Sequence, residues 1–299
     1  MGVAMRGYVG GSDLRAMQEL TQRTWTPASA QHIGDLAWGR FMCTADRADW
    51  PIVLWEDGTR VVAWGWAEFP DDLRLQVDPA YPELVDEVLT WFDAVADGSP
   101  RELKVLDNQV DLHQALVSHG YRLRNDPAFF TYHARSLLDL PPPELPRGFV
   151  ARAVRGLEDL GNRVAVHRNA WDSTRVTEQS YRNLMNAWPY RSELDWVIEA
   201  PNGEFVANCH IWYDDGNRVG LIEPVGTAPM FRRQGLSRAV CLAALEALRE
   251  AGAVMAVVSP RGDEAYPIPQ KLYRSMGFQP YARTRTYAKT EPVRRVDSP

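Results

Sequence analysis

The sequence predicts an α/β protein, in the broad sense that includes α+β folds, from an alternation of strands and helices. An apolar strand that reaches Val225 runs into a basic, glycine-containing loop, and the loop runs directly into a helix from Leu236. The apolar residues of that helix recur with a period of 3.6 residues. A second apolar strand, Val254–Val258, follows the helix. This order indicates a sheet that is covered by helices.

The chain also divides into two halves that look alike. A length of 299 residues suggests two domains. Residues 141–147 are rich in proline, which excludes helix interiors and central strands, so they form a stiff linker. Landmarks on the two sides recur at a nearly constant separation: Pro79, Gly120 and Tyr132 correspond to Pro229, Gly277 and Tyr287. A constant separation favours a duplicated fold.

Composition narrows the class of protein. The apolar content of 45% is sufficient for real cores, and the net charge of −6 argues against nucleic acid as a partner. No stretch approaches the length of a membrane span, and Met1–Asp13 lacks the apolar core of a signal peptide, so we expect a cytoplasmic protein with no membrane partner. Cys43, Cys209 and Cys241 are odd in number and far apart, which is typical of buried thiols rather than of a redox or metal site.

The loop before Leu236 has the chemistry of an anion site. The start of a helix presents unpaired N–H groups and the positive end of its dipole. Arg232 and Arg233 add full charges, and Gly235 allows a phosphate to approach the backbone. The loop therefore predicts a pyrophosphate cradle. It is not a Walker loop, because no Gly-Lys-Ser/Thr follows, and no G-x-G-x-x-G is present.

Further motifs follow the loop in a characteristic order. After the second strand, a short helix carries Leu272-Tyr273 and stops at Gly277-Phe278, where glycine suits the left-handed cap. With these motifs, the segment from Phe149 to Lys289 resembles the GNAT superfamily of acyl-CoA N-acyltransferases. The resemblance implies two tandem GNAT folds, each a mixed, mostly antiparallel twisted sheet flanked by helices.

The same resemblance implies acetyl-CoA as cosubstrate, with no metal. The pyrophosphate would lie on the loop, and the acyl-pantetheine arm would run along the end of the preceding strand. Pro224 cannot donate within that strand, so a bulge or a splayed edge is expected there. The predicted binding residues are Val225, Gly226, Thr227, Arg232, Arg233, Gln234, Gly235, Leu236, Ser237 and Arg238.

Acetyl transfer to an amine requires a base and an acid. A lysine-type amine has a pKa of about 10.4, so only about one in 10³ is neutral at pH 7. Glu223 interrupts an apolar face just before the acyl site and is the candidate base; the alternative is a carboxylate that pairs with an arginine or holds the bulge. His210 is the second candidate. By the resemblance, Tyr273 is the candidate acid at the departing sulfur, or else a core tyrosine, and the N–H of Gly226 or Thr227 is the oxyanion donor.

The two halves are predicted to differ in function. We expect a degenerate GNAT-like domain over 1–140, a linker over 141–147, and a GNAT domain that binds acetyl-CoA and carries catalysis over 148–299. No arginine or glycine follows Pro79 before the next helix, whose start is acidic and would repel a pyrophosphate. The first domain is therefore expected to shape the substrate cleft or to support its partner. Its acidic residues at this point are Asp78, Glu83, Asp86 and Glu87.

These features predict an N-acetyltransferase that acts on a primary amine of a small molecule, such as a metabolite or an antibiotic. The alternatives are a non-catalytic acyl-CoA-binding or sensing module, and an acyltransferase acting on a protein lysine or a thiol. A homodimer is compatible with this hypothesis. An aromatic and acidic set could form a pocket for a cationic acceptor, although core positions are the alternative. Its members are Trp171, Asp172, Trp188, Trp212, Tyr213, Asp214 and Asp215.

Overall fold

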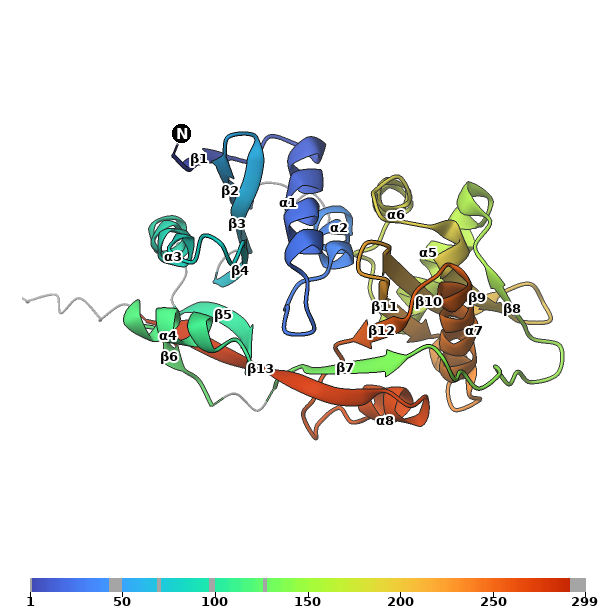
Figure 1. Cartoon of the computed structure of the whole chain (residues 1–299). Coiled ribbons are helices and arrows are strands. Elements are labelled where there is room, and N and C mark those ends of the chain that lie inside the picture. The colour runs from blue at the N-terminus through green and yellow to red at the C-terminus, as the bar shows by residue number, and fades with distance from the viewer. Residues whose placement is uncertain (1, 43–49, 69–70, 97–99, 126–127, 291–299) are drawn as a thin grey trace, which may run out of the picture.

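The computed structural model describes residues 2–42, 50–68, 71–96, 100–125 and 128–290, which form two lobes (Figure 1). The elements of the first half are β1 (Ala4–Gly7), α1 (Gly11–Thr24), α2 (Ile33–Phe41), β2 (Ile52–Asp57), β3 (Arg60–Glu68), β4 (Asp72–Val77), α3 (Leu84–Val95), β5 (Arg101–Leu106), α4 (Val110–Ser118), β6 (Arg122–Leu123) and β7 (Thr131–Ser136). Those of the second half are β8 (Val150–Ala153), α5 (Leu160–Trp171), α6 (Glu178–Met185), β9 (Asp195–Glu199), β10 (Phe205–Asp214), β11 (Val219–Thr227), α7 (Leu236–Glu250), β12 (Met255–Val258), α8 (Ile268–Ser275) and β13 (Gln279–Lys289).

The second half repeats the first, element by element. The order strand, two helices, three strands, helix, strand, helix holds from β1 to α4 and again from β8 to α8. In each half, the last of three successive antiparallel strands is followed by a helix and then by a strand that pairs with it in parallel. These parallel pairs are β4 with β5 and β11 with β12, and the other pairings are antiparallel. The predicted fold class, two tandem mixed and mostly antiparallel sheets with flanking helices, is confirmed.

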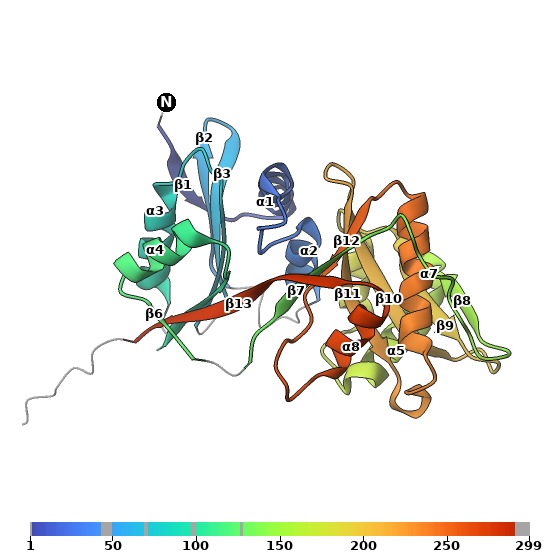
Figure 2. The same cartoon turned by 60° about the horizontal axis from the view of Figure 1, so that its bottom comes forward.

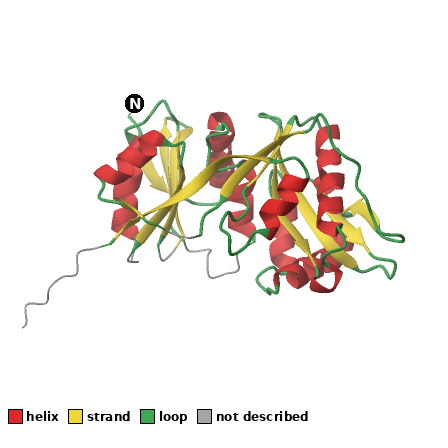
Figure 3. Cartoon of the chain, turned by 90° about the horizontal axis from the view of Figure 1, so that it is seen from below, coloured by secondary structure: helices red, strands yellow, loops and turns green. Residues whose placement is uncertain are grey.

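The two halves exchange their last strands. β7 belongs to the first half by sequence, yet it lies between β12 and the start of β13, with Ala134 opposite Val257. The end of β13 in turn pairs with β5 of the first half, with Thr284 opposite Leu106. Figures 2 and 3 show β13 running from one lobe into the other, so that a single sheet continues through the molecule. The predicted division at 141–147 therefore follows the chain but not the sheets, and as a division into folding units it stays a prediction.

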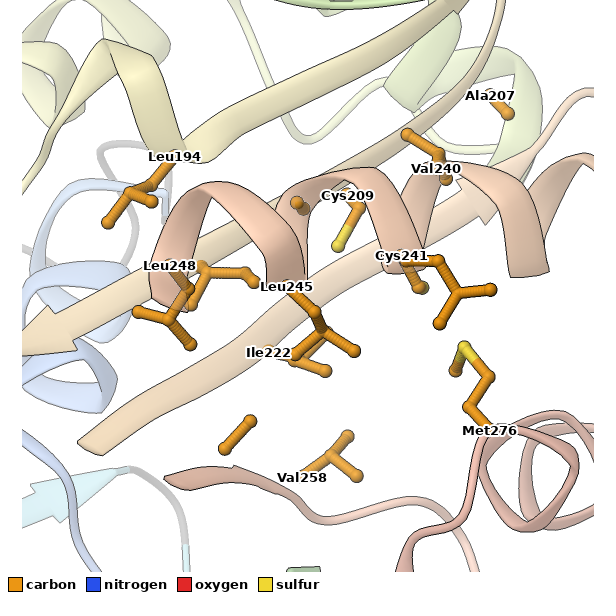
Figure 4. Packing of buried hydrophobic residues seen from close by; sticks show 14 of the residues in the cluster. Leu194, Ala207, Cys209, Ile222, Val240, Cys241, Leu245, Leu248, Val258 and Met276 are labelled. Carbon is orange, nitrogen blue, oxygen red and sulfur yellow. The ribbon is translucent and has the colours of Figure 1, made fainter. Parts of the chain in front are cut away.

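The core of the second half lies between its sheet and α7. Val240, Cys241 and Leu245 of α7 face Cys209 and Ile222 of the sheet, all of them buried (Figure 4). This is the apolar face that the 3.6-residue period of α7 predicted. Both of these cysteines are free thiols in a hydrophobic cluster, as expected, whereas Cys43 lies outside the described residues.

The opposite face of the same sheet is covered by α5, by α6 and by α2 from the first half. Gly34 of α2 lies so close to β10 that a Cβ on it would stand 2.2 Å from Cγ of Trp212. The Trp38 ring of α2 lies 5.9 Å from the His167 ring of α5, centroid to centroid. The first half therefore inserts a helix into the packing of the second.

Within the described part of the chain, no helix is both long and apolar enough to cross a membrane.

Candidate active site

The strands β11 and β12 separate beside the predicted acyl site. Their parallel pairing ends at Leu221 and Val257, although β11 continues to Thr227. At the same point the pairing of β11 with β10 shifts: Ile222 lies opposite Ile211 and Val225 opposite Cys209, so that two residues of β11 face one of β10. This bulge at Glu223–Pro224 confirms the expectation from Pro224, which has no N–H for the ladder.

The loop before α7 has the geometry of an anion cradle. Gly235 is the N-cap at φ 78, a left-handed conformation that suits glycine, and no atom of another residue would meet a Cβ there within 4 Å. The N–H of Ala239 donates to Gly235 O at 3.0 Å. The three preceding amides, of Leu236, Ser237 and Arg238, have no carbonyl one turn earlier in the helix and remain available to a ligand.

The two arginines of the loop are placed differently. Arg232 donates to Thr227 O at 3.3 Å and to Ala170 O at 3.1 Å, so it ties the loop to the end of β11 and to α5. Arg233 is exposed at φ 65 and makes no hydrogen bond or ion pair to another described residue. The Ser237 hydroxyl lies 2.6 Å from that of Thr227 and joins helix to strand. Of the two arginines, only Arg233 is thus without a partner among the described residues, and its contact with a phosphate stays a prediction.

The strand end that should hold the pantetheine arm is tightly supported. Gly226 lies opposite Asn208 of β10, and a Cβ on Gly226 would stand 2.6 Å from the Ala170 Cβ and 3.3 Å from Trp171 Nε1. The end of α5 therefore fixes one side of this strand, and only glycine fits there without a shift. Whether Val225 and Thr227 contact a ligand stays a prediction.

Glu223 lies in the bulge. Burial, followed by the charge of Asp35 from the first half, raises the pKa of Glu223 to about 8, against the opposing charge of Arg74. A carboxyl group with a pKa near the working pH suits a general base. The sequence analysis missed Asp35 and Arg74, because nothing in their spacing links them to Glu223.

Tyr273 is buried in the core of the second half. It is 6% exposed and packs edge to face on Phe278, with ring centroids 5.7 Å apart, so it is part of the core. Burial, followed by the charges of Cys241, Cys209 and Glu223, raises the pKa of its hydroxyl well above the usual value. Tyr273 therefore keeps its proton near neutral pH and can donate it.

His210, the second candidate base, is a core residue. Its ring stacks on Tyr190 with centroids 5.1 Å apart, and its side chain is fully buried. Its Nδ1 lies 3.8 Å from Asp195 Oδ1, too far for a hydrogen bond, and burial lowers the pKa of the ring. The structure places His210 where an acceptor amine has no access, which favours the alternative of an ordinary core contact.

The aromatic and acidic set does not form one pocket. Trp212 and Asp214 are fully buried, and the Asp214 carboxylate accepts hydrogen bonds from Gln22 and Asn217. Arg15 lies 3.6 Å above the Trp188 ring. The prediction of a cationic pocket from these residues is wrong, because strand alternation buries some members while others meet the first half.

A narrow cavity, with a volume of about 20 Å³, lies elsewhere. It is lined by Trp25, Ser29, Ala30, Gln31, His32, Asp35, Tyr132, Leu221, Val257, Val258, Ser259 and Tyr281.

A separated strand pair and a helix start with free amides are the two features that the sequence analysis expected of an acyl-transfer site. Residues 163–278 match the family model described as "Acetyltransferase (GNAT) family". The second half therefore carries a GNAT acetyltransferase domain, and the first half repeats its order of elements.

Solved structures agree with this fold over the whole chain. A GCN5-related N-acetyltransferase from Sphaerobacter thermophilus is 18% identical, with a TM-score of 0.61 over 96% of this chain and 95% of that one. A tandem GNAT protein from the clavulanic acid biosynthesis pathway is 14% identical, with a TM-score of 0.64 over 97% and 98%. A GNAT-family acetyltransferase from Colwellia psychrerythraea is 12% identical, with a TM-score of 0.62 over 95% and 99%. These likenesses concern the fold. No curated protein matches the chain in sequence.

Proposed function

We propose that the protein transfers the acetyl group of acetyl-CoA to a primary amine of a small molecule. The observation that carries this proposal is Glu223, a carboxyl group with a pKa of about 8 in the bulge where β11 leaves β12. Bound acetyl-CoA supplies a thioester, whose C–S bond breaks as the C–N bond of the amide forms. The amine loses a proton and the sulfur gains one, so the site needs one group for each transfer.

The chain offers a residue for every requirement. The amides of Leu236, Ser237 and Arg238, with Arg233, would hold the pyrophosphate, and the open space at Gly235 fits its approach. The backbone of the bulged strand, at Gly226 and Thr227, would align the acyl group and donate to its oxygen. Glu223 would accept the amine proton, and Tyr273 would donate to the sulfur. Holding the two reactants together supplies much of the acceleration.

The test is a panel of small amines with release of the coenzyme A thiol as readout, together with calorimetry of acetyl-CoA binding. Glu223→Gln should lower kcat by about 10²- to 10⁴-fold and leave the Kd of acetyl-CoA unchanged, because glutamine cannot accept the proton. Glu204→Gln, on an exposed turn, is the matched control and should retain kcat. Unchanged turnover in the Glu223 variant would remove its assigned role. Tight binding of acetyl-CoA with no acetylated amine would favour the acyl-CoA-sensing alternative.

The pH dependence gives an independent test. Glu223 must be deprotonated to act as a base, so kcat/KM should rise with pH and level off above about pH 8, near the pKa of this group. The ionisation of the acceptor amine adds a pH dependence of its own to kcat/KM. The contribution of Glu223 is therefore the part of the profile that the Glu223→Gln variant loses with the same acceptor, and identical profile shapes would contradict the assignment.

A further inference from the structure

The narrow cavity of about 20 Å³ lies where β11 and β12 separate. Leu221 and Val257, the last parallel pair of these two strands, both line the cavity, and so does Ser259, which follows β12. Leu221 and Val257 are buried, whereas Ser259 is half-buried. The cavity therefore has an apolar floor at the strand separation, the place where the acyl group is expected.

The first half builds much of the cavity wall. The connection between α1 and α2 lines the cavity from Ser29 to His32. The carbonyl group of Ala30 accepts a hydrogen bond from the Tyr132 hydroxyl of β7 at 3.0 Å. The Tyr132 ring meets the Tyr281 ring of β13 edge to face, with centroids 6.2 Å apart, and both residues line the cavity. The space beside the strand separation is thus bounded by residues from both halves of the chain.

This wall is held against the second half by contacts of α1 and α2. The Gln18 side chain of α1 donates to Ile33 O at 2.9 Å and to Trp188 O at 2.9 Å, which ties the start of α2 to the second half. Gly34 of α2 lies against Trp212 of β10 with no room for a Cβ. The connection that precedes α2 therefore has a fixed position over the strand separation, and the cavity is preformed.

The volume of the cavity limits what can enter it. A water molecule requires about 10–15 Å³, so the cavity has room for one or two groups of that size. An amino nitrogen and the single carbon that bears it are such groups, whereas a branch on that carbon exceeds the space. The side chains of Leu221 and Val257 suit the carbon, and the carboxyl group of Asp35 and the hydroxyl group of Tyr281 offer acceptors for the N–H groups.

We propose that this cavity receives the amino end of the acceptor and selects primary amines with an unbranched carbon next to the nitrogen. Ala30 of the first half and Val257 of the second are then specificity-determining residues. The rest of the acceptor would lie outside, near the half-buried Ser29 and Gln31. The assignment rests on the proposed function, because the amine has to meet an acetyl group at the strand separation.

The test compares butylamine with sec-butylamine, two isomers of equal charge that differ in the branch next to the nitrogen. Branching by itself slows attack on a thioester, so the measured quantity is how each variant changes the two kcat/KM values. Ala30→Leu narrows the cavity and should lower kcat/KM for butylamine by about tenfold or more, with the Kd of acetyl-CoA unchanged. Val257→Ala widens the cavity and should reduce the preference for butylamine by about tenfold.

A second measurement needs no turnover. Methyl groups are observed by NMR in the full-length protein, and the Val257 signals are assigned by their loss in Val257→Ala. Coenzyme A, which has no acyl group to transfer, replaces acetyl-CoA. Butylamine should then shift the Val257 signals of the unchanged protein and leave those of Ala30→Leu in place.

Ala28→Leu is the matched control: it makes the same change in the same connection, at an exposed position that does not line the cavity, and should behave as the unchanged protein. If Ala30→Leu does not fold, as judged by thermal unfolding, Ser259→Val narrows the cavity from the other half. An isomer preference that Val257→Ala leaves unchanged would overturn the proposal, as would unshifted Val257 signals in the unchanged protein. Failure to acetylate any amine would overturn the proposed function instead, and the NMR titration would still decide whether the cavity takes an amine.

Discussion

At the scale of single residues, Tyr273 shows how one side chain can serve the core and the chemistry. Its ring packs on Phe278 within the cluster under α7, while burial keeps its hydroxyl protonated. The structure places the side chain in the core, and the role of its hydroxyl as the acid at the departing sulfur stays a prediction. The two roles can be separated by removing the hydroxyl alone.

Tyr273→Phe should lower kcat by about 10²-fold, because the leaving sulfur loses its proton donor, while the ring still fills the core. The change in thermal midpoint should be small. Tyr266→Phe is a suitable control, since Tyr266 is 48% exposed and lies just before α8. A rate equal to that of the unchanged protein would assign Tyr273 to the core only.

A second residue-scale feature is the fully buried ion pair of Arg163 with Asp195. Arg163 Nε donates to Asp195 Oδ1 at 2.8 Å, and the hydroxyl groups of Tyr181 and Tyr190 donate to its other oxygen. Burial by itself would raise the pKa of Asp195, but Arg163 and the hydrogen bonds hold it well below its usual value. The carboxylate is thus charged at every pH at which the protein works.

Asp195→Ala should destabilise the fold by about 3–5 kcal/mol, because it leaves the Arg163 guanidinium buried without a counter-charge. Chemical denaturation at pH 7 measures this loss. Asp215→Ala, which removes an exposed partner of Arg191, should cost less than about 1 kcal/mol. Similar losses in the two variants would contradict the view that the buried pair is special.

At the scale of elements, the conformation of the loop between β11 and α7 depends both on its own backbone and on contacts with other elements. The local part is the left-handed Gly235 and the free amides of the first helical turn. The tertiary part is Arg232, which donates to carbonyl groups of β11 and α5, and Ser237, which contacts Thr227. The sequence analysis assigned the same role to Arg232 and Arg233, whereas in the structure only Arg233 of these two has no hydrogen-bond partner among the described residues.

Arg233→Glu should therefore weaken acetyl-CoA binding by about tenfold or more without a loss of stability, since it replaces an attraction to phosphate by a repulsion. The weakening should diminish at high salt. Arg249→Glu, at the other end of the same helix and exposed, is the control and should leave the Kd unchanged. Calorimetry at two salt concentrations checks both; equal effects of the two variants would contradict a specific role for the loop.

At the scale of the whole molecule, β7 and β13 pair each half with the sheet of the other. Each sheet needs a strand from the other half to satisfy the backbone of β12 or of β5. The junction also brings α2 to the back of the second sheet, where Gly34 packs on Trp212 of β10. The first half thus contributes a helix to the packing of the second.

Residues 1–140 and 148–299, produced separately, should each fail to fold, because each would leave a core strand unpaired and part of its apolar face exposed. Mixed together, they should regain the circular dichroism and the single thermal transition of the intact chain. A fragment that melted cooperatively alone would contradict this expectation and would support the division into independent domains.

Much of this protein can be read from its sequence, because the signals are local. The period of α7, the glycine at the loop, Pro224 in a strand and the landmarks shared by the halves each depend on neighbouring residues, and they predicted the tandem fold, the bulge and the cradle. What the tertiary structure decided is which distant groups meet. Strand exchange and the burial of His210 and Trp212 depend on how the two sheets pack. The ionisation of a carboxyl group such as Glu223 follows from its burial and from the charges around it, which sequence spacing does not encode.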